Sequence, residues 1–344
     1  MRVWPVANAF DALAPVIERA AADAAALDSL LQGAREPFVI RGLVADWPLV
    51  QAGRRSARDV RAYLVERAKP GPFAVSIGSP EHGGRMFYDN AMGMNFSMAR
   101  GALADIFAGI DANEDRADPP TIYLGSIDVP SHFDRVHEDN RIDLSARTPL
   151  VSLWIGTRTR IAAHNDFPDN LACCVAGRRR FTLFPPDQFA NLYLGPIDNT
   201  PAGRAVSMVD FQAPDFDLHP GFAKALEFGQ VAELEPGDAL FIPSMWWHHV
   251  EGLAPFNILL NYWWRDTPRY LGQPQDALNH AILSIRDLPD HDKAIWRDLF
   301  DHYVFANGPH VTDHLPPGGR GVLDPLDAEA AGRLRSFLLR TLSR

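Results

Sequence analysis

His164 and Asp166 are the residues whose types and spacing most clearly suggest chemistry. One residue separates them, and side chains two apart on an extended strand project from the same face. A second strand-like segment, residues 237–243, is followed by His248. Two imidazoles and one carboxylate can occupy one face of an octahedral ferrous ion and leave the opposite positions open. The working hypothesis is therefore an Fe(II) site formed by His164, Asp166 and His248.

The sequence around these residues is more specific than the three-residue pattern. Residues 183–189 read LFPPDQF and residues 242–251 read IPSMWWHHVE. With these strings, the chain from Pro37 to Trp264 resembles the JmjC-type cupin-like hydroxylases, most of all their asparaginyl hydroxylases. The resemblance implies a reaction with Fe(II), 2-oxoglutarate and O2. It also selects His248 over His249 as the ligand, and it implies no catalytic residue beyond the three ligands.

Arg179 is the predicted anchor for the co-substrate, because a guanidinium can hold a carboxylate through two parallel charge-assisted hydrogen bonds. Strand alternation turns its neighbours Arg178 and Arg180 the other way, towards solvent. The most similar family member has a lysine at this position, and it has a threonine where this chain has Ile161. The resemblance assigns the remaining co-substrate positions to Tyr123, Asn170, Asn261 and Trp263. Each of these four is also compatible with an ordinary place in the core.

Closely spaced strands must hold these residues. Strand-like segments follow one another from Thr121 to Trp264 without intervening helices, which favours a double-sheet barrel over an α/β fold. This is the double-stranded β-helix (cupin or jelly-roll, JmjC-type) that the resemblance implies. Gly177 is predicted to turn a hairpin with arms at residues 170–175 and 178–184.

Helices are predicted on both sides of the barrel. Residues 10–31 and 56–67 have helical patterns, the second with a capping-box spacing at its start. After residue 267 the pattern changes to three helices with apolar residues at helical spacing, at residues 276–287, 291–304 and 327–342. We therefore divide the chain into a catalytic domain, 1–267, and a helical segment, 268–344. The resemblance implies a homodimer through these last helices, and the alternative is that they pack on their own barrel.

Composition limits the possible partners and compartments. The 344 residues are 47% hydrophobic and 22% charged, which is ordinary for a soluble protein. A net charge of −10 disfavours nucleic acid as a partner. Cys173 and Cys174 are adjacent and provide no disulfide framework. Because neither a secretory signal nor a membrane-spanning run is seen, we expect a cytoplasmic protein.

The sequence thus predicts an Fe(II)- and 2-oxoglutarate-dependent hydroxylase acting on a protein or peptide side chain. One alternative is a 2-oxoglutarate oxygenase acting on a small molecule or an RNA nucleoside. A second is a cupin that uses its metal as a Lewis acid, for instance an isomerase, which would need neither Arg179 nor oxygen. A third is a binding module that keeps the fold without turnover.

Overall fold

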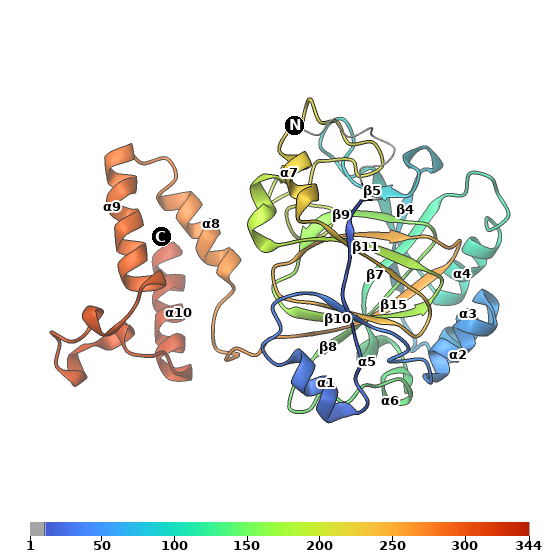
Figure 1. The fold of residues 1–344 in the computed structure, drawn as a ribbon, viewed down its shortest axis with the longest axis horizontal. Helices are drawn as coiled ribbons and strands as arrows, with labels where there is room; N and C mark the ends of the chain where they lie inside the picture. The colour runs from blue at the N-terminus through green and yellow to red at the C-terminus, as the bar shows by residue number, and fades with distance from the viewer. Residues whose placement is uncertain (1–9, 11, 344) are drawn as a thin grey trace. The chain divides into compact units, whose positions relative to one another are not determined.

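The computed structural model describes residue 10 and residues 12–343. The chain forms two compact units, and the boundary between them lies between Arg265 and Asp266. Strands make up the framework of the first unit, and helices make up the second (Figure 1).

Two mixed β-sheets form the first unit, and side chains from both sheets pack between them, among them Cys174 and Phe181. The six-stranded sheet contains, in order, β1 (Ala14–Pro15), β12 (Gln230–Leu234), β11 (Arg179–Phe184), β14 (Trp247–Gly252), β9 (Arg160–Asn165) and β5 (Arg85–Met86). The nine-stranded sheet contains β2 (Glu18–Arg19), β3 (Phe38–Ile40), β13 (Ala239–Ile242), β10 (Asp169–Ala176), β15 (Asn257–Trp264), β8 (Leu150–Gly156), β7 (Thr121–Asp128), β4 (Phe73–Gly78) and β6 (Phe96–Gly101). The predicted mainly β architecture with flanking helices is confirmed.

Short helices accompany the sheets of the first unit. Leu49 of α2, Val60 of α3 and Phe107 of α4 share one apolar cluster with residues of the nine-stranded sheet. The Ser56 side chain accepts a hydrogen bond from the Asp59 amide at the start of α3, as the capping spacing predicted. The helices of this unit are α1 (Ala24–Leu31), α2 (Pro48–Arg55), α3 (Ala57–Val65), α4 (Leu103–Asp111), α5 (Val129–His132), α6 (Val136–Asp139) and α7 (Phe222–Glu227), with 3-10 turns at Pro80–His82 and Pro186–Ala190.

Gly177 does not turn a hairpin, and that prediction was wrong. The strand before it, β10, pairs with β13 and β15, whereas the strand after it, β11, pairs with β12 and β14. Gly177 therefore carries the chain from one sheet to the other. Its φ of +73° and its close approach to Asn257 and the Phe256 carbonyl favour glycine, because a side chain would have no room there.

The predicted N-terminal helix was wrong over much of its length. Only Ala24–Leu31 of the described residues in this segment is helical. Two short strands precede it, β1 beside β12 and β2 beside β3, both in parallel pairs. Pro15 accounts for part of this difference, because proline disrupts the interior of a helix. Residue 11 of the predicted helix lies outside the described residues.

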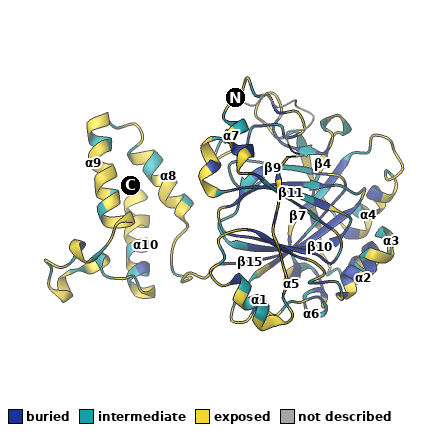
Figure 2. Ribbon diagram, viewed as in Figure 1, coloured by how far each residue is buried: buried dark blue, intermediate teal, exposed yellow. Residues whose placement is uncertain are grey.

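The second unit contains α8 (Pro274–Ser284), α9 (Asp290–Phe300) and α10 (Ala328–Leu342), close to the three predicted helices. A π-helical turn, Asp301–Phe305, extends α9, and 3-10 turns occur at Pro309–Val311, Pro317–Gly319 and Gly321–Leu323. Within the described part of this unit, the buried hydrophobic residues are Val311 and Ala331. Figure 2 shows that much of its surface is exposed.

Candidate metal centre

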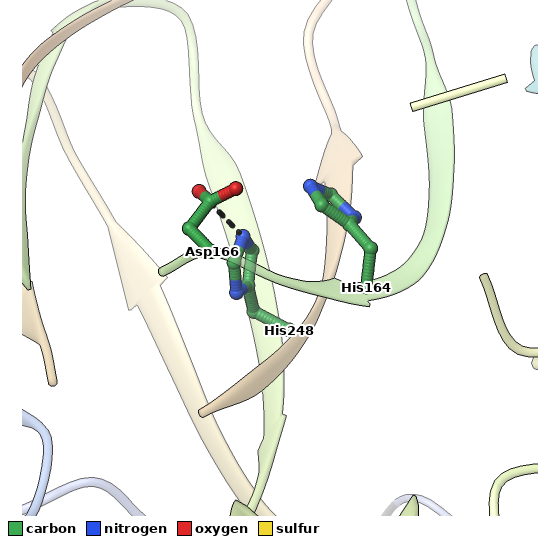
Figure 3. A group of neighbouring side chains, drawn as sticks. All are labelled: His164, Asp166 and His248. Carbon is green, nitrogen blue, oxygen red and sulfur yellow. Dashed lines mark ion pairs between the residues drawn. The ribbon is translucent and has the colours of Figure 1, made fainter. Parts of the chain in front are cut away.

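His164, Asp166 and His248 lie together at one place in the first unit (Figure 3). His164 on β9 and His248 on β14 are directly opposed across an antiparallel pair, so both project from the same face. Their ring centroids are 4.4 Å apart. Asp166 follows the end of β9, and one ligand atom from each of the three residues lies within 4.8 Å of the others. The strand register thus gathers three possible metal ligands.

Both histidines have one ring nitrogen occupied by the backbone. The Nδ1 atom of His164 lies 2.8 Å from the Ala162 carbonyl, and that of His248 lies 3.1 Å from the Trp246 carbonyl. With Nδ1 as the donor, Nε2 is left with a free lone pair for a metal. Burial, together with the neighbouring His164, lowers the pKa of His248 to about 4. His248 is therefore neutral near pH 7, as a ligand must be.

His249 belongs to a different environment. Its ring packs against Phe211 at a tilt of 35° with centroids 4.6 Å apart, and its two nitrogens have no hydrogen-bond partner among the described residues. Burial lowers its pKa to about 3. This histidine is outside the group formed by His164, Asp166 and His248, in agreement with the alternation expected along a strand.

A cavity of about 350 Å³ opens beside the three residues. The structure brings every predicted co-substrate residue to its wall: Tyr123, Asn170, Arg179, Asn261 and Trp263. Ile161 also lines it and contributes no hydrogen-bonding side chain. Strands from both sheets thus converge on one cavity.

Arg179 is a buried cation in this wall, with 2% of its surface exposed. One of its nitrogens donates to the Trp154 carbonyl at 3.2 Å, and its Nε has no partner in the described part of the chain. No carboxylate of the described residues lies within ion-pair distance of it, and burial lowers its pKa. A buried charge without a counter-charge is costly. An anionic ligand would remove that cost.

The flanking arginines face outward, as strand alternation predicted. Arg178 is exposed and lies 3.9 Å from Glu235. Arg180 pairs with Glu233 at 2.6 Å and is half exposed. Of the three successive arginines, Arg179 is the one that lines the cavity.

Two asparagines and a phenol complete the polar wall. The Asn261 amide donates to the Asn170 side-chain oxygen at 2.7 Å, which leaves the Asn261 oxygen without a partner among the described residues. Burial raises the pKa of Tyr123 to about 12, so that its hydroxyl remains protonated at neutral pH and can donate a hydrogen bond. Unsatisfied buried polar atoms are rare in folded proteins, and here they adjoin a cavity.

Trp154 is a cavity residue that sequence reasoning missed. Its carbonyl accepts from Arg179, and its ring meets Trp263 edge to face, with centroids 5.6 Å apart. It is opposite Leu259, two residues before Asn261, and therefore lies on the same face as Asn261, but this register depends on a strand pairing that the sequence does not show.

These residues fit a ferrous centre with an anionic co-substrate. Two imidazoles and a carboxylate match the donor set of the facial triad of non-haem iron oxygenases. Arg179 and the Asn261 side-chain oxygen, which lack a counter-charge and a hydrogen-bond partner respectively within the described part of the chain, line the same cavity.

The chain belongs to the family described as Cupin-like domain, whose model matches residues 24–270. The two-sheet fold agrees with this family. The cupin-like part of the expected resemblance is therefore confirmed.

Several characterised proteins are similar over part of their length. The chain is 31% identical over 210 residues to tRNA wybutosine-synthesizing protein 5 of Gallus gallus, covering 56% of this chain and 59% of that protein. It is 31% identical over 139 residues to HSPB1-associated protein 1 of Rattus norvegicus, covering 38% and 27%. It is 31% identical over 116 residues to Lysine-specific demethylase JMJ31 of Arabidopsis thaliana, covering 33% and 21%. In each case the match spans less than two thirds of the relative.

These relatives modify two expectations. They do not confirm a special likeness to the asparaginyl hydroxylases. The expectation that nucleic acid is an unlikely partner is no longer supported, because one relative is named for the synthesis of a tRNA nucleoside. A net charge of −10 does not exclude a local surface that binds nucleic acid. Among the described residues, no helix is long and apolar enough to cross a membrane. The cytoplasmic location stays a prediction.

Proposed function

We propose that this protein is an Fe(II)- and 2-oxoglutarate-dependent oxygenase that hydroxylates a protein or peptide side chain. The observation that carries the proposal is the buried Arg179, which has no carboxylate partner among the described residues and lies in the same cavity as His164, Asp166 and His248. A metal site alone is compatible with many reactions. A buried cation beside it specifies an anionic co-substrate.

In this proposal His164, Asp166 and His248 hold the ferrous ion. Bound iron supplies the redox chemistry that couples decarboxylation of 2-oxoglutarate to hydroxylation of a C–H bond. One oxygen atom of O2 enters the substrate, the other enters succinate, and CO2 leaves. Arg179 holds the far carboxylate, and the protonated Tyr123 donates a hydrogen bond to it. The enclosing side chains orient the reactants and exclude water.

Other functions make different demands on these residues. A Lewis-acid cupin would use the three ligands without needing Arg179. An oxygenase acting on an RNA nucleoside would use the whole cavity, and the likeness to tRNA wybutosine-synthesizing protein 5 favours this second candidate.

A turnover assay tests the proposed function. Purified protein with Fe(II), 2-oxoglutarate and O2 should form succinate slowly even without substrate, and omission of any one component should stop it. Asp166→Ala provides the matched inactive control. Succinate formed equally by this variant, or by wild type without O2, would overturn the proposal.

Tyr123→Phe should weaken 2-oxoglutarate binding by roughly 10- to 100-fold. A hydrogen bond to a charged group typically contributes about 1.5–3 kcal/mol. Calorimetric titration of the zinc-loaded protein, in which the metal is redox-inert, measures this. An unchanged Kd would mean that the phenol is a core residue without a role in binding.

We also propose that the second unit mediates a homodimer. Large apolar side chains are exposed on all three of its helices, including Leu283, Ile295 and Leu339. Exposed apolar clusters of this kind often mark protein contacts.

Ile295→Glu should therefore convert a dimer to a monomer in light scattering, because it would bury an unpaired charge at the interface. Arg297→Glu, at an exposed position of the same helix α9, serves as the control and should remain dimeric. A monomeric wild-type protein would contradict the prediction.

A further inference from the structure

Polar and apolar residues occupy different ends of the cavity. In the six-stranded sheet Arg179 lies on β11 and Met86 on β5, with the metal-ligand strands β14 and β9 between them. In the nine-stranded sheet Asn170 lies on β10 and Asn261 on β15. Strands β4 and β6 are the last two strands at one edge of that sheet. The three candidate metal ligands therefore lie between a polar end of the cavity, at Arg179, and a second end, at Met86.

The two sheets contact each other at both the polar end and the second end of the cavity. At the polar end, Arg179 of one sheet donates to the Trp154 carbonyl of the other. At the second end, Gly78 of β4 lies against the Met86 side chain of β5. The cavity therefore runs from Arg179, past the candidate ligands, to Met86 and β6.

Apolar side chains make up most of the second end. Its wall is formed by Ala74, Met86, Phe96, Ala162, Pro201, Ala202 and Val206. Ser76 and Ser126 add hydroxyl groups nearby. Among the described lining residues, the acidic and basic ones are Asp166, a candidate metal ligand, and Arg179, which lies at the opposite end. A charged group placed among these apolar side chains would lose its hydration without a partner, which is costly.

Hydrogen bonds fix the loop that covers this end. The Tyr88 hydroxyl donates to the Asn199 carbonyl at 2.5 Å, and the Asn199 amide donates to the Met92 carbonyl at 2.7 Å. Val206 packs with Phe87 and Tyr88 in a small buried cluster. The covering segment that carries Ala202 is thus tied to the chain that leads into β6.

β6 offers an open sheet edge beside the apolar end. It is the last strand of its sheet, and no described strand pairs with its outer side. Four successive residues, Ser97–Arg100, are exposed, and Met98 has 65% of its surface exposed while also lining the cavity. Natural edge strands are usually protected by charge, proline or a covering segment. Between Phe96 and Ala99 this strand has neither charge nor proline.

We propose that the substrate is an extended polypeptide that pairs with the free edge of β6 and places an uncharged, apolar side chain in the apolar end of the cavity. This inference rests on the proposed function and specifies its substrate. Main-chain pairing at an open edge supplies affinity, and a pocket for an alternate side chain supplies selectivity. Phe96 and Met98, two residues apart, connect the edge to the cavity.

An RNA base fits the apolar end less well than an aliphatic side chain. Enzymes that receive a base read its polar edge with hydrogen bonds and stack its ring. Phe96 could provide a stacking surface, but the polar side chains at or beside this end among the described residues are the hydroxyls of Ser76, Ser126 and Tyr123, the last of which is opposite Ser76. An aliphatic side chain needs no such partners.

Peptide libraries provide the first test. Each library has one fixed central residue (leucine, methionine, asparagine, lysine or glutamate) between randomised positions, and each is incubated with the full-length protein, Fe(II), 2-oxoglutarate and O2. We expect a gain of one oxygen on the fixed residue in the leucine or methionine library, at least about tenfold above the lysine and glutamate libraries. Methionine is also scored after reduction of any sulfoxide. Preference for a charged residue or for asparagine, or stimulation by RNA but by no peptide, would overturn the proposal.

A charge placed in the cavity wall provides the second test. Ala202→Asp should reduce peptide-dependent turnover at least about tenfold while leaving the Kd for 2-oxoglutarate unchanged, because the change lies away from Arg179. Ala205→Asp is the matched control, since Ala205 is similarly half-buried in the same loop but does not line the cavity. Equal effects of the two substitutions would contradict a substrate site at Ala202.

Backbone methylation tests the pairing with β6. In the best peptide, N-methylation at successive residues should abolish binding at alternate positions only, because alternate amides face the neighbouring strand. Binding is measured by fluorescence anisotropy of a labelled peptide on the zinc-loaded protein. Uniform tolerance, or loss without alternation, would reject the pairing.

Failure of this inference can be distinguished from failure of the proposed function. If the protein binds 2-oxoglutarate and forms succinate without substrate but oxidises no peptide, the polypeptide assignment is wrong and the oxygenase assignment stands. If it neither binds 2-oxoglutarate nor forms succinate, the proposed function itself is wrong and this inference falls with it.

Discussion

Replacing Arg179 with alanine should weaken 2-oxoglutarate binding by about 2–5 kcal/mol, or roughly 30- to 4,000-fold. The guanidinium is buried and has no carboxylate partner among the described residues, so the ligand would provide its counter-charge. Without Arg179, the far carboxylate of 2-oxoglutarate would lose both its hydration and its partner. Calorimetric titration of the zinc-loaded variants measures the change.

The neighbouring arginines are matched controls. Arg178→Ala and Arg180→Ala remove the same charge from solvent-facing positions, where an ion pair typically contributes less than about 1 kcal/mol. Arg179→Lys should retain part of the affinity, since it keeps the charge but loses the second parallel hydrogen bond. Equal, small effects at all three positions would place the anchor elsewhere, with Tyr123 the next residue to test.

Thermal unfolding separates binding from folding in these variants. Without ligand, Arg179→Met should be as stable as wild type or more stable, because it removes a buried charge and retains volume. Addition of 2-oxoglutarate should raise the Tm of wild type and leave that of Arg179→Met unchanged. A large loss of stability in the unliganded variant would indicate that Arg179 has a structural role.

Removing a candidate metal ligand should have the second large effect. Asp166→Ala or His248→Ala should weaken Fe(II) binding by more than about 100-fold, because loss of an outer partner of a ligand alone typically costs about 10- to 100-fold. Turnover should fall to background, and the far-ultraviolet circular dichroism should be unchanged. Metal content after desalting provides a readout that does not depend on activity.

His249→Ala is the control for the choice of histidine. His249 packs against Phe211, outside the group of three, so its loss should lower stability and leave metal content intact. Loss of iron from His249→Ala with retention by His248→Ala would show that the assignment of the two histidines is reversed.

Local patterns predicted which of several consecutive side chains face the cavity. Period-two alternation correctly separated Arg179 from Arg178 and Arg180, and it turned His249 away from His248. Both inferences needed only the strand direction of a few consecutive residues. Which strands pair did not matter to them.

Features that depend on long-range pairing were not accessible from sequence. β10 and β11 read as two arms of a hairpin around Gly177, yet they belong to different sheets. The two-residue strands β1 and β2 are too short to show periodicity and exist through their pairing with β12 and β3. For the same reason, the apolar end of the cavity could not be predicted, since Met86, Phe96 and Ala202 come from three distant segments.

Anaerobic addition of Fe(II) and 2-oxoglutarate tests directly whether the cavity binds both together. We expect a weak visible charge-transfer band that appears only when both are present and is absent from Asp166→Ala. Arg179→Ala should need far more 2-oxoglutarate to produce the band. A wild-type protein that binds Fe(II) but shows no spectral change with saturating 2-oxoglutarate would rule out the proposed oxygenase site.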